Sequence, residues 1–156
     1  MERRSYKAAQ ALLDLPDYRI YVASAAGQKI AGFIAEWQLD GLLFLEHLAV
    51  QPALRGSGIG SNMVKRYLDH VDRPVVLEVE EPNSRLAARR IHFYQKLGFK
   101  LSDYGYVQPN MQPVNEEPVA LKIMHYPDGM TEKEFLQFKK LVSERVYQPK
   151  KTGKNG

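Results

Sequence analysis

The chain has 156 residues, of which 44% are hydrophobic and 26% charged, with a formal net charge of +4. This composition is typical of one folded domain, and the absence of cysteine excludes disulfides, thiolate metal sites and a cysteine nucleophile. No apolar run approaches the roughly 20 residues of a membrane helix, and no basic face with interleaved aromatics indicates nucleic-acid binding. We therefore expect a cytoplasmic protein with one domain over residues 1–147 and a flexible basic tail over 148–156.

The first part of the chain predicts one short helix and then three strands. Asp40-Gly41 is a strong signal for a tight turn between the second and third strands. The third strand, LLFLEHLAV, is apolar on both faces, which predicts a central strand covered on both sides. The helix is expected over residues 4–14 and the strands over 18–25, 29–38 and 42–50.

The remainder predicts helices and strands that alternate before two final strands and a last helix. Gly98 is expected to end one helix in a left-handed conformation. Thr131 and Glu134 have the spacing of a capping box at the start of the last helix. The helices are expected after Gly60 and over 84–97 and 131–147, and the strands over 75–80, 99–107 and 119–124. This order predicts a mixed α/β or α+β domain.

A glycine-rich turn, Arg55-Gly56-Ser57-Gly58-Ile59-Gly60, joins the central strand to the next helix. Glycines let backbone N–H groups approach an anion closely, and the start of a helix adds partial positive charge. The dinucleotide-binding pattern fails because Ser61 stands where the third glycine is required, and no P-loop Gly-Lys-Ser/Thr follows. The turn therefore predicts a phosphate site of another kind.

Residues 48–60, LAVQPALRGSGIG, resemble motif A of the GNAT acetyltransferase superfamily, and residues 92–99, HFYQKLGF, resemble the end of its motif B. The glycine turn alone is a weak signal, but the two motifs in this order with a strand between them are specific. The resemblance implies a sheet that is mixed, mostly antiparallel and splayed at its central strands, with helices on both faces. It also implies acetyl-CoA as the cofactor.

The resemblance further implies which residues hold acetyl-CoA. The splayed edge of the central strand would bind the pantetheine arm as it would bind an added strand, and N–H groups of the turn would bind the pyrophosphate. The motif B asparagine position is occupied by Ala87, so Asn83 is the substitute candidate and would also cap its helix. The expected cofactor residues are Leu48, Ala49, Val50, Arg55, Gly56, Ser57, Gly58, Ile59, Gly60, Ser61 and Asn83.

In the family, an amine attacks the thioester directly while side chains move the protons. Tyr94 matches the motif B tyrosine and is the expected proton donor to the CoA thiolate, although by helical periodicity alone it is a core residue. Glu46 interrupts the apolar central strand and is the candidate base, because a buried carboxylate is costly unless it is paired or functional. A purely structural carboxylate is the alternative. Glu78 and Glu80 are rival bases.

By strand alternation, Glu46 is expected to share a face with Phe44, Leu48 and Val50. The acceptor amine, on a small molecule or peptide, is expected to meet carboxylates and aromatics that could equally be ordinary surface residues. These candidate substrate-binding residues are Glu36, Trp37, Glu80 and Tyr106.

The histidines have no metal-ligand spacing, so no metal is expected. The chain before the first predicted strand is too short for the strand and two helices that begin the family fold, and a homodimer is a family expectation. The alternative functions are a non-catalytic acyl-CoA-binding module and an acyltransferase with another acyl chain or a hydroxyl acceptor.

Overall fold

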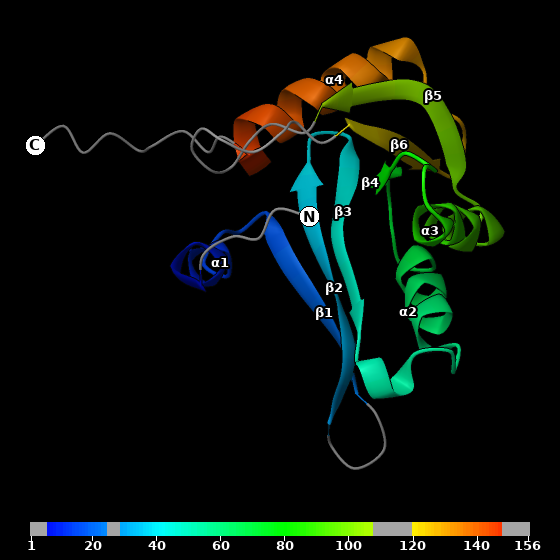
Figure 1. Ribbon diagram of the computed structural model, residues 1–156. Helices are drawn as coiled ribbons and strands as arrows, with labels where there is room; N and C mark the ends of the chain where they lie inside the picture. Colours follow the sequence, from blue (N-terminus) through cyan, green and yellow to red (C-terminus); the bar gives the residue numbers. More distant parts are fainter. Residues whose placement is uncertain (1–5, 25–28, 108–119, 148–156) are drawn as a thin grey trace, which may run out of the picture.

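A six-stranded sheet organises the protein, whose computed structural model describes residues 6–24, 29–107 and 120–147. The strand order is β1-β2-β3-β4-β6-β5, and every neighbouring pair is antiparallel except β3 and β4 (Figure 1). The predicted mixed, mostly antiparallel sheet is confirmed. The strands are β1 (Tyr18–Ser24), β2 (Ile30–Leu39), β3 (Leu42–Val50), β4 (Val75–Glu80), β5 (Lys100–Val107) and β6 (Ala120–Tyr126).

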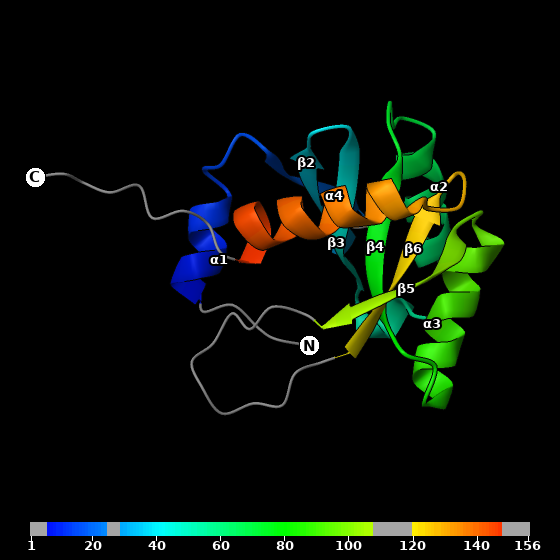
Figure 2. The same cartoon turned by 90° about the horizontal axis from the view of Figure 1, so that it is seen from above.

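Helices cover both faces of the sheet. The α-helices are α1 (Tyr6–Leu12), α2 (Ile59–Leu68), α3 (Arg85–Lys96) and α4 (Glu132–Val142); the short helical turns are η1 (Pro52–Leu54) and the π-helical η2 (Ser143–Tyr147). Helix α4 crosses one face, and α2 and α3 lie on the other (Figure 2). We call these the α4 face and the α2/α3 face.

Each face has its own apolar cluster. On the α4 face, Phe44 and Phe138 are 1% and 0% exposed, and their rings meet edge to face at 5.6 Å between centroids. On the α2/α3 face, Leu45 of β3 and Leu77 of β4 join the buried side chain of Tyr67. Fully burying such a side chain contributes about 1.5–3 kcal/mol. The central strands β3 and β4 are therefore held between two packed layers.

The helix ends follow local sequence signals, with one exception. Gly98 has φ of 100° after α3, and Thr131 and Glu134 form the predicted capping box of α4. Helix α3, however, is capped by Ser84, whose hydroxyl accepts the Ala87 N–H at 3.1 Å. The expectation that Asn83 caps this helix is wrong, because a hydroxyl one residue later already accepts the N3 amide.

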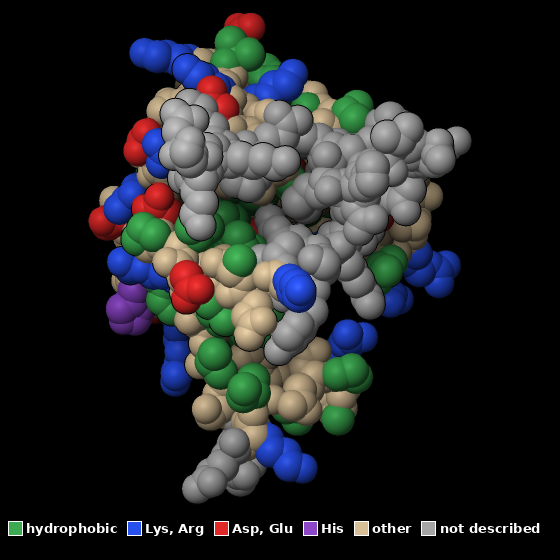
Figure 3. Space-filling model, turned by 90° about the vertical axis from the view of Figure 1, so that its left-hand side faces the viewer, with side chains coloured by type: hydrophobic (Ala, Val, Ile, Leu, Met, Phe, Trp, Pro, Cys, Tyr) green, Lys and Arg blue, Asp and Glu red, His purple; other side chains and the backbone are tan. Residues whose placement is uncertain are grey.

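Strand β1 lies at the edge of the sheet, and within the described residues only β2 pairs with it. The described residues before β1 contain α1 and a turn, so the first strand of the GNAT fold is not found among them. On this side of the molecule, hydrophobic side chains lie at the surface beside Lys and Arg (Figure 3). In β1, the Ile20 and Val22 side chains are half-exposed.

In the described part of the chain, no helix has the length and apolarity needed to cross a bilayer. No group of three His, Cys, Asp or Glu side chains there is placed to hold a metal ion. The predicted basic tail over 148–156 lies outside the described residues.

Candidate active site

Strands β3 and β4 separate soon after they begin. They pair at only two positions, Leu43 with Val75 and Phe44 with Val76. Beyond these pairs, β3 continues along β2 and β4 continues along β6. The facing edges of the two central strands are therefore not bonded to each other over their C-terminal parts. Such an edge can bind an extended chain as an added strand, and it is the splay that the GNAT resemblance implied.

The glycine-rich turn lies directly after the splayed part of β3. Gly56 and Gly58 both have φ of 83°, and a Cβ built on either would have nothing within 4 Å. Gly58 is the N-cap of α2 and provides no side-chain capping bond to the first turn of that helix. Gly58 thus offers no side-chain acceptor to the first N–H groups of α2, and the dipole of the helix favours an anion there. This geometry fits a pyrophosphate.

Gly60 brings the two motif segments into contact. A Cβ at this position would lie 3.4 Å from Cγ2 of Val50 and 3.8 Å from the ring of Phe93. The start of α2 therefore packs between the end of β3 and helix α3. Within the turn, the Ser57 hydroxyl donates to the Leu54 carbonyl at 2.5 Å, which holds its backbone bend.

The remaining predicted cofactor residues are less closely grouped. Arg55 and Asn83 are exposed, and Ser61 is partly buried in the first turn of α2. Leu48 is partly buried against the α2/α3-face cluster. The cofactor roles of these residues stay predictions.

Tyr94 of α3 is a buried residue of the α2/α3-face cluster. Its side chain is 6% exposed, belongs to the cluster of Leu45 and Leu77, and meets the Phe99 ring edge to face at 5.4 Å. Burial raises the pKa of the Tyr94 hydroxyl to about 12, although the charge of Arg90 opposes this. The phenol is consequently protonated at neutral pH and able to donate. Its role beside the sulfur stays a prediction.

Glu46 lies at a bulge in β3. Ala35 of β2 pairs with His47 and Glu36 pairs with Leu45, so the register passes over Glu46. Bulges of this kind re-aim a side chain and are common beside active sites.

The bulge changes which residues share a face. Glu46 accepts a hydrogen bond from Trp37 Nε1 on the α4 face, where Phe44 also packs. Leu48 instead packs with the α2/α3-face cluster, and Val50 faces Gly60 of α2. The predicted shared face of Glu46 with Leu48 and Val50 is therefore wrong, because one inserted residue shifts the period-two alternation.

Glu78 stands on β4 just beyond its last pair with β3. The Tyr147 hydroxyl donates to its Oε1 atom, whereas the buried Oε2 atom has no hydrogen-bond partner among the described residues. Burial raises the pKa of Glu78 to about 7; the bond from Tyr147 lowers it and the charge of Glu46 raises it. A carboxylate with a pKa near neutrality and one oxygen without a hydrogen bond is suited to accept a proton.

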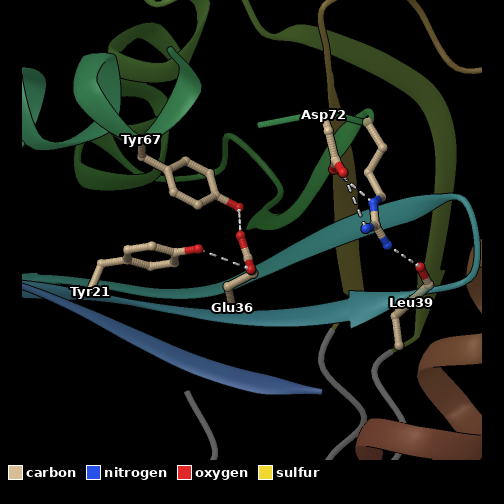
Figure 4. Close-up of polar contacts among 6 residues, drawn as sticks. Tyr21, Glu36, Leu39, Tyr67 and Asp72 are labelled. Atoms are coloured by element: carbon tan, nitrogen blue, oxygen red, sulfur yellow. Dashed lines mark hydrogen bonds and ion pairs between the residues drawn. The ribbon is translucent and has the colours of Figure 1, made fainter. Parts of the chain in front are cut away.

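Glu36 lies on the opposite face from Glu46 and Glu78. It is 1% exposed and accepts hydrogen bonds from the Tyr67 hydroxyl at 2.5 Å and the Tyr21 hydroxyl at 3.5 Å (Figure 4). Burial and the bond to Glu36 raise the pKa of Tyr67. These groups line a cavity of about 470 Å³ between the β1–β2 hairpin and α2.

Glu36 and Trp37, both predicted to bind the substrate, therefore lie on opposite faces of the sheet. Trp37 and Tyr106 are 3% and 8% exposed and belong to the α4-face cluster, so they are core residues rather than surface residues. Glu80 is exposed at the end of β4. Of the four predicted substrate residues, only Trp37 bonds directly to a carboxylate at the splay.

Tyr147 is the site residue that the sequence did not indicate. The helical pattern predicts that Phe135, Phe138, Leu141 and Val142 face inward, and Tyr147 does not fall on this apolar stripe. A tyrosine near the end of an amphipathic helix carries no motif, so only its contact with Glu78 identifies it.

Comparisons with known proteins agree with this geometry. The family model described as "Acetyltransferase (GNAT) domain" matches residues 16–101. A putative GNAT-family acetyltransferase from Bacteroides thetaiotaomicron has a TM-score of 0.87 and 29% identity, over 96% of this chain and 84% of that one. A comparison with curated proteins found no match to this sequence.

Two more distant solved structures share the fold. The ribosomal-protein-S18-alanine N-acetyltransferase from Escherichia coli has 22% identity and a TM-score of 0.61, over 83% of this chain and 81% of that one. A mutant form of the spermidine N-acetyltransferase SpeG from Vibrio cholerae has 16% identity and a TM-score of 0.59, over 76% and 70% of the two chains.

Proposed function

Because the chain belongs to the GNAT acetyltransferase family, we propose that it transfers the acetyl group of acetyl-CoA directly to a primary amine of a small molecule or peptide. The observation that carries this proposal is the adjacency of two features: the splay between β3 and β4, and the uncapped glycine turn that follows β3. The splay suits the extended pantetheine arm of coenzyme A, and the glycine turn suits its pyrophosphate.

When bound, acetyl-CoA supplies an acetyl group activated as a thioester. Residues 48–50 would hold the pantetheine arm through their backbone, and the N–H groups of residues 55–61 would hold the pyrophosphate. This placement would bring the thioester to the start of the splay, between Tyr94 on the α2/α3 face and Glu78 on the α4 face.

The base is assigned to the Glu46–Glu78 pair, with Glu78 as the member that takes the proton. Glu46 already accepts from Trp37, and its negative charge favours the protonated form of Glu78. The Oε2 atom of Glu78, which accepts no hydrogen bond from the described residues, is the acceptor for a proton of the incoming ammonium. Two carboxylates beside an indole also suit a cationic acceptor.

Tyr94 is assigned the opposite task, donating its hydroxyl proton to the departing sulfur. Its raised pKa keeps this proton in place until the thiolate forms. We expect Tyr94→Phe to bind acetyl-CoA normally but to release thiol at least about tenfold more slowly. Equal turnover by the mutant and the wild type would remove Tyr94 from the reaction.

Calorimetry with acetyl-CoA tests the cofactor site, using Gly58→Ala and Gly41→Ala as a matched pair. Gly41, in the β2–β3 turn, has φ of 77° and, like Gly58, has nothing within 4 Å of a built Cβ. Both mutants therefore carry a similar backbone strain of about 1–2 kcal/mol. We expect acetyl-CoA to bind at least about tenfold more weakly to Gly58→Ala, because a methyl group enters the anion site, and normally to Gly41→Ala.

Catalysis is tested by measuring CoA thiol released from acetyl-CoA with a panel of primary amines. Release above the rate without amine supports the transferase. Tight cofactor binding with release only at the background rate would indicate a non-catalytic acyl-CoA-binding module instead. Absence of acetyl-CoA binding by the folded wild type would overturn the proposal as a whole.

A further inference from the structure

The last turn of the described chain lies outside the segment that matches the family model, yet it reaches the splay. Turn η2 is a five-residue π-helix, Ser143–Tyr147, that continues α4. In an α-helix, residue 147 would lie about 140° around the axis from Val142. The i→i+5 spacing of a π-helix brings it back to the side of Val142. Tyr147 is consequently 6% exposed and packed in the α4-face cluster.

Two contacts hold α4 and η2 against the sheet at the β2–β3 turn. Arg145 Nη2 lies 3.1 Å from Asp40 Oδ2, and Gln137 Nε2 donates to the Asp40 carbonyl at 3.3 Å. Val146, which is 3% exposed, adds apolar contact. The segment that carries Tyr147 thus contacts the rest of the fold at positions other than Glu78.

We propose that Tyr147 is a positioning residue for Glu78, fixing Oε1 by its hydroxyl bond so that Oε2 remains the proton-accepting oxygen. This inference rests on the proposed function and extends it to a part of the chain that the family match does not cover. In the proton transfer, an N–H bond of the ammonium breaks as an O–H bond forms at Oε2. Glu78 becomes neutral, and Tyr147 keeps its own proton throughout.

The groups around Glu78 determine whether its pKa rises or falls when Tyr147 is changed. Glu46 faces it from β3 and Tyr147 from η2, while Ile123 lies opposite it on β6. The other ionisable groups on this face of β4 and β6 are Glu80, which is exposed, and His125, which lies 3.3 Å from Glu134 of α4. Tyr147 stabilises the carboxylate form, whereas burial and Glu46 stabilise the protonated form.

The test compares wild type with Tyr147→Phe, which keeps the ring and loses the hydroxyl. Removing a hydrogen bond to a charged group should raise the pKa of Glu78 by about one pH unit. The rise of kcat/KM with pH should then occur about one pH unit higher, so the mutant should be about fivefold slower at pH 7 and within about twofold of wild type at pH 9. Tyr126→Phe, on the α3 side of the sheet, is the control and should have the wild-type profile.

A direct titration decides the inference even if no amine in the panel is a substrate. The carboxyl carbon of Glu78, identified in the 13C NMR spectrum by its loss in Glu78→Gln, reports the pKa in each variant. We expect a higher pKa in Tyr147→Phe and a lower one in Glu46→Gln, which removes a like charge. An unchanged pKa in Tyr147→Phe, or a loss of kcat/KM that is equal at pH 7 and pH 9, would overturn the role of Tyr147 while leaving the proposed transferase intact.

Discussion

Glu36 and Glu78 lie on opposite faces of the sheet, and the groups around their two carboxylates differ. Glu36 accepts from Tyr67 and Tyr21, so both of its oxygens are bonded. Glu78 accepts from Tyr147 at one oxygen only, and Glu46 places a second negative charge beside it. A fully bonded carboxylate ties α2 to the β1–β2 hairpin, whereas a half-bonded one keeps an oxygen available for a proton.

The sharpest test of this comparison exchanges each carboxylate for its amide. Glu78→Gln should lower kcat by about 1,000-fold, because an amide cannot take a proton from the acceptor. Glu36→Gln should leave kcat within about twofold and lower thermal stability, because the amide nitrogen replaces one acceptor that the tyrosines use. Thiol-release kinetics and thermal melting on the same samples measure both effects. The reverse outcome, with Glu36 needed for turnover and Glu78 dispensable, would contradict the comparison.

The pH dependence of stability gives the second test. The pKa of Glu78, about 7, lies above its ordinary value of 4.5, so the protonated form favours the folded state. This stabilisation is complete below about pH 4.5 and is lost as the pH rises through about 7. Relative to Glu78→Gln, the free energy of unfolding of wild type should fall over this window by up to about 3 kcal/mol.

Urea unfolding of both proteins at pH 5 and pH 8 measures this difference. Titrating groups that do not interact with Glu78 contribute equally to the two proteins and cancel, whereas Glu46 interacts with Glu78 and does not. If the difference in unfolding free energy between wild type and Glu78→Gln were the same at pH 5 and pH 8, the pKa of Glu78 would not be raised. The proposed availability of Glu78 for a proton would then be contradicted.

The smallest expected effect concerns the hydrogen bonds that Tyr67 and Tyr21 donate to Glu36. Tyr67→Phe removes the shorter bond to a buried carboxylate and should lower the free energy of unfolding by about 1–3 kcal/mol. Tyr21→Phe is the matched control; its bond is 3.5 Å long and its side chain is 41% exposed, so we expect a loss below about 1 kcal/mol. Chemical denaturation provides both values. Equal losses of unfolding free energy in the two mutants would show that burial does not decide how much each tyrosine stabilises the fold.

Local features of the chain were predictable from the residues. Strands β3 and β4 have the predicted bounds, 42–50 and 75–80, because their apolar runs end at turn residues. The capping box at Thr131 and the left-handed Gly98 are encoded within a few residues of each helix end. The paired motifs at 48–60 and 92–99 also indicated the family, which the match over 16–101 shows.

The arrangement of side chains around the splay depended on contacts between distant segments. A bulge at Glu46 exists only in the pairing of β2 with β3, so counting along β3 assigned Leu48 to the wrong face. The π-helical turn that carries Tyr147 inward departs from the period of α4. Local sequence encodes which elements form and where they end; register, bulges and helix docking set which carboxylate has an open oxygen, because those depend on partners far away in the chain.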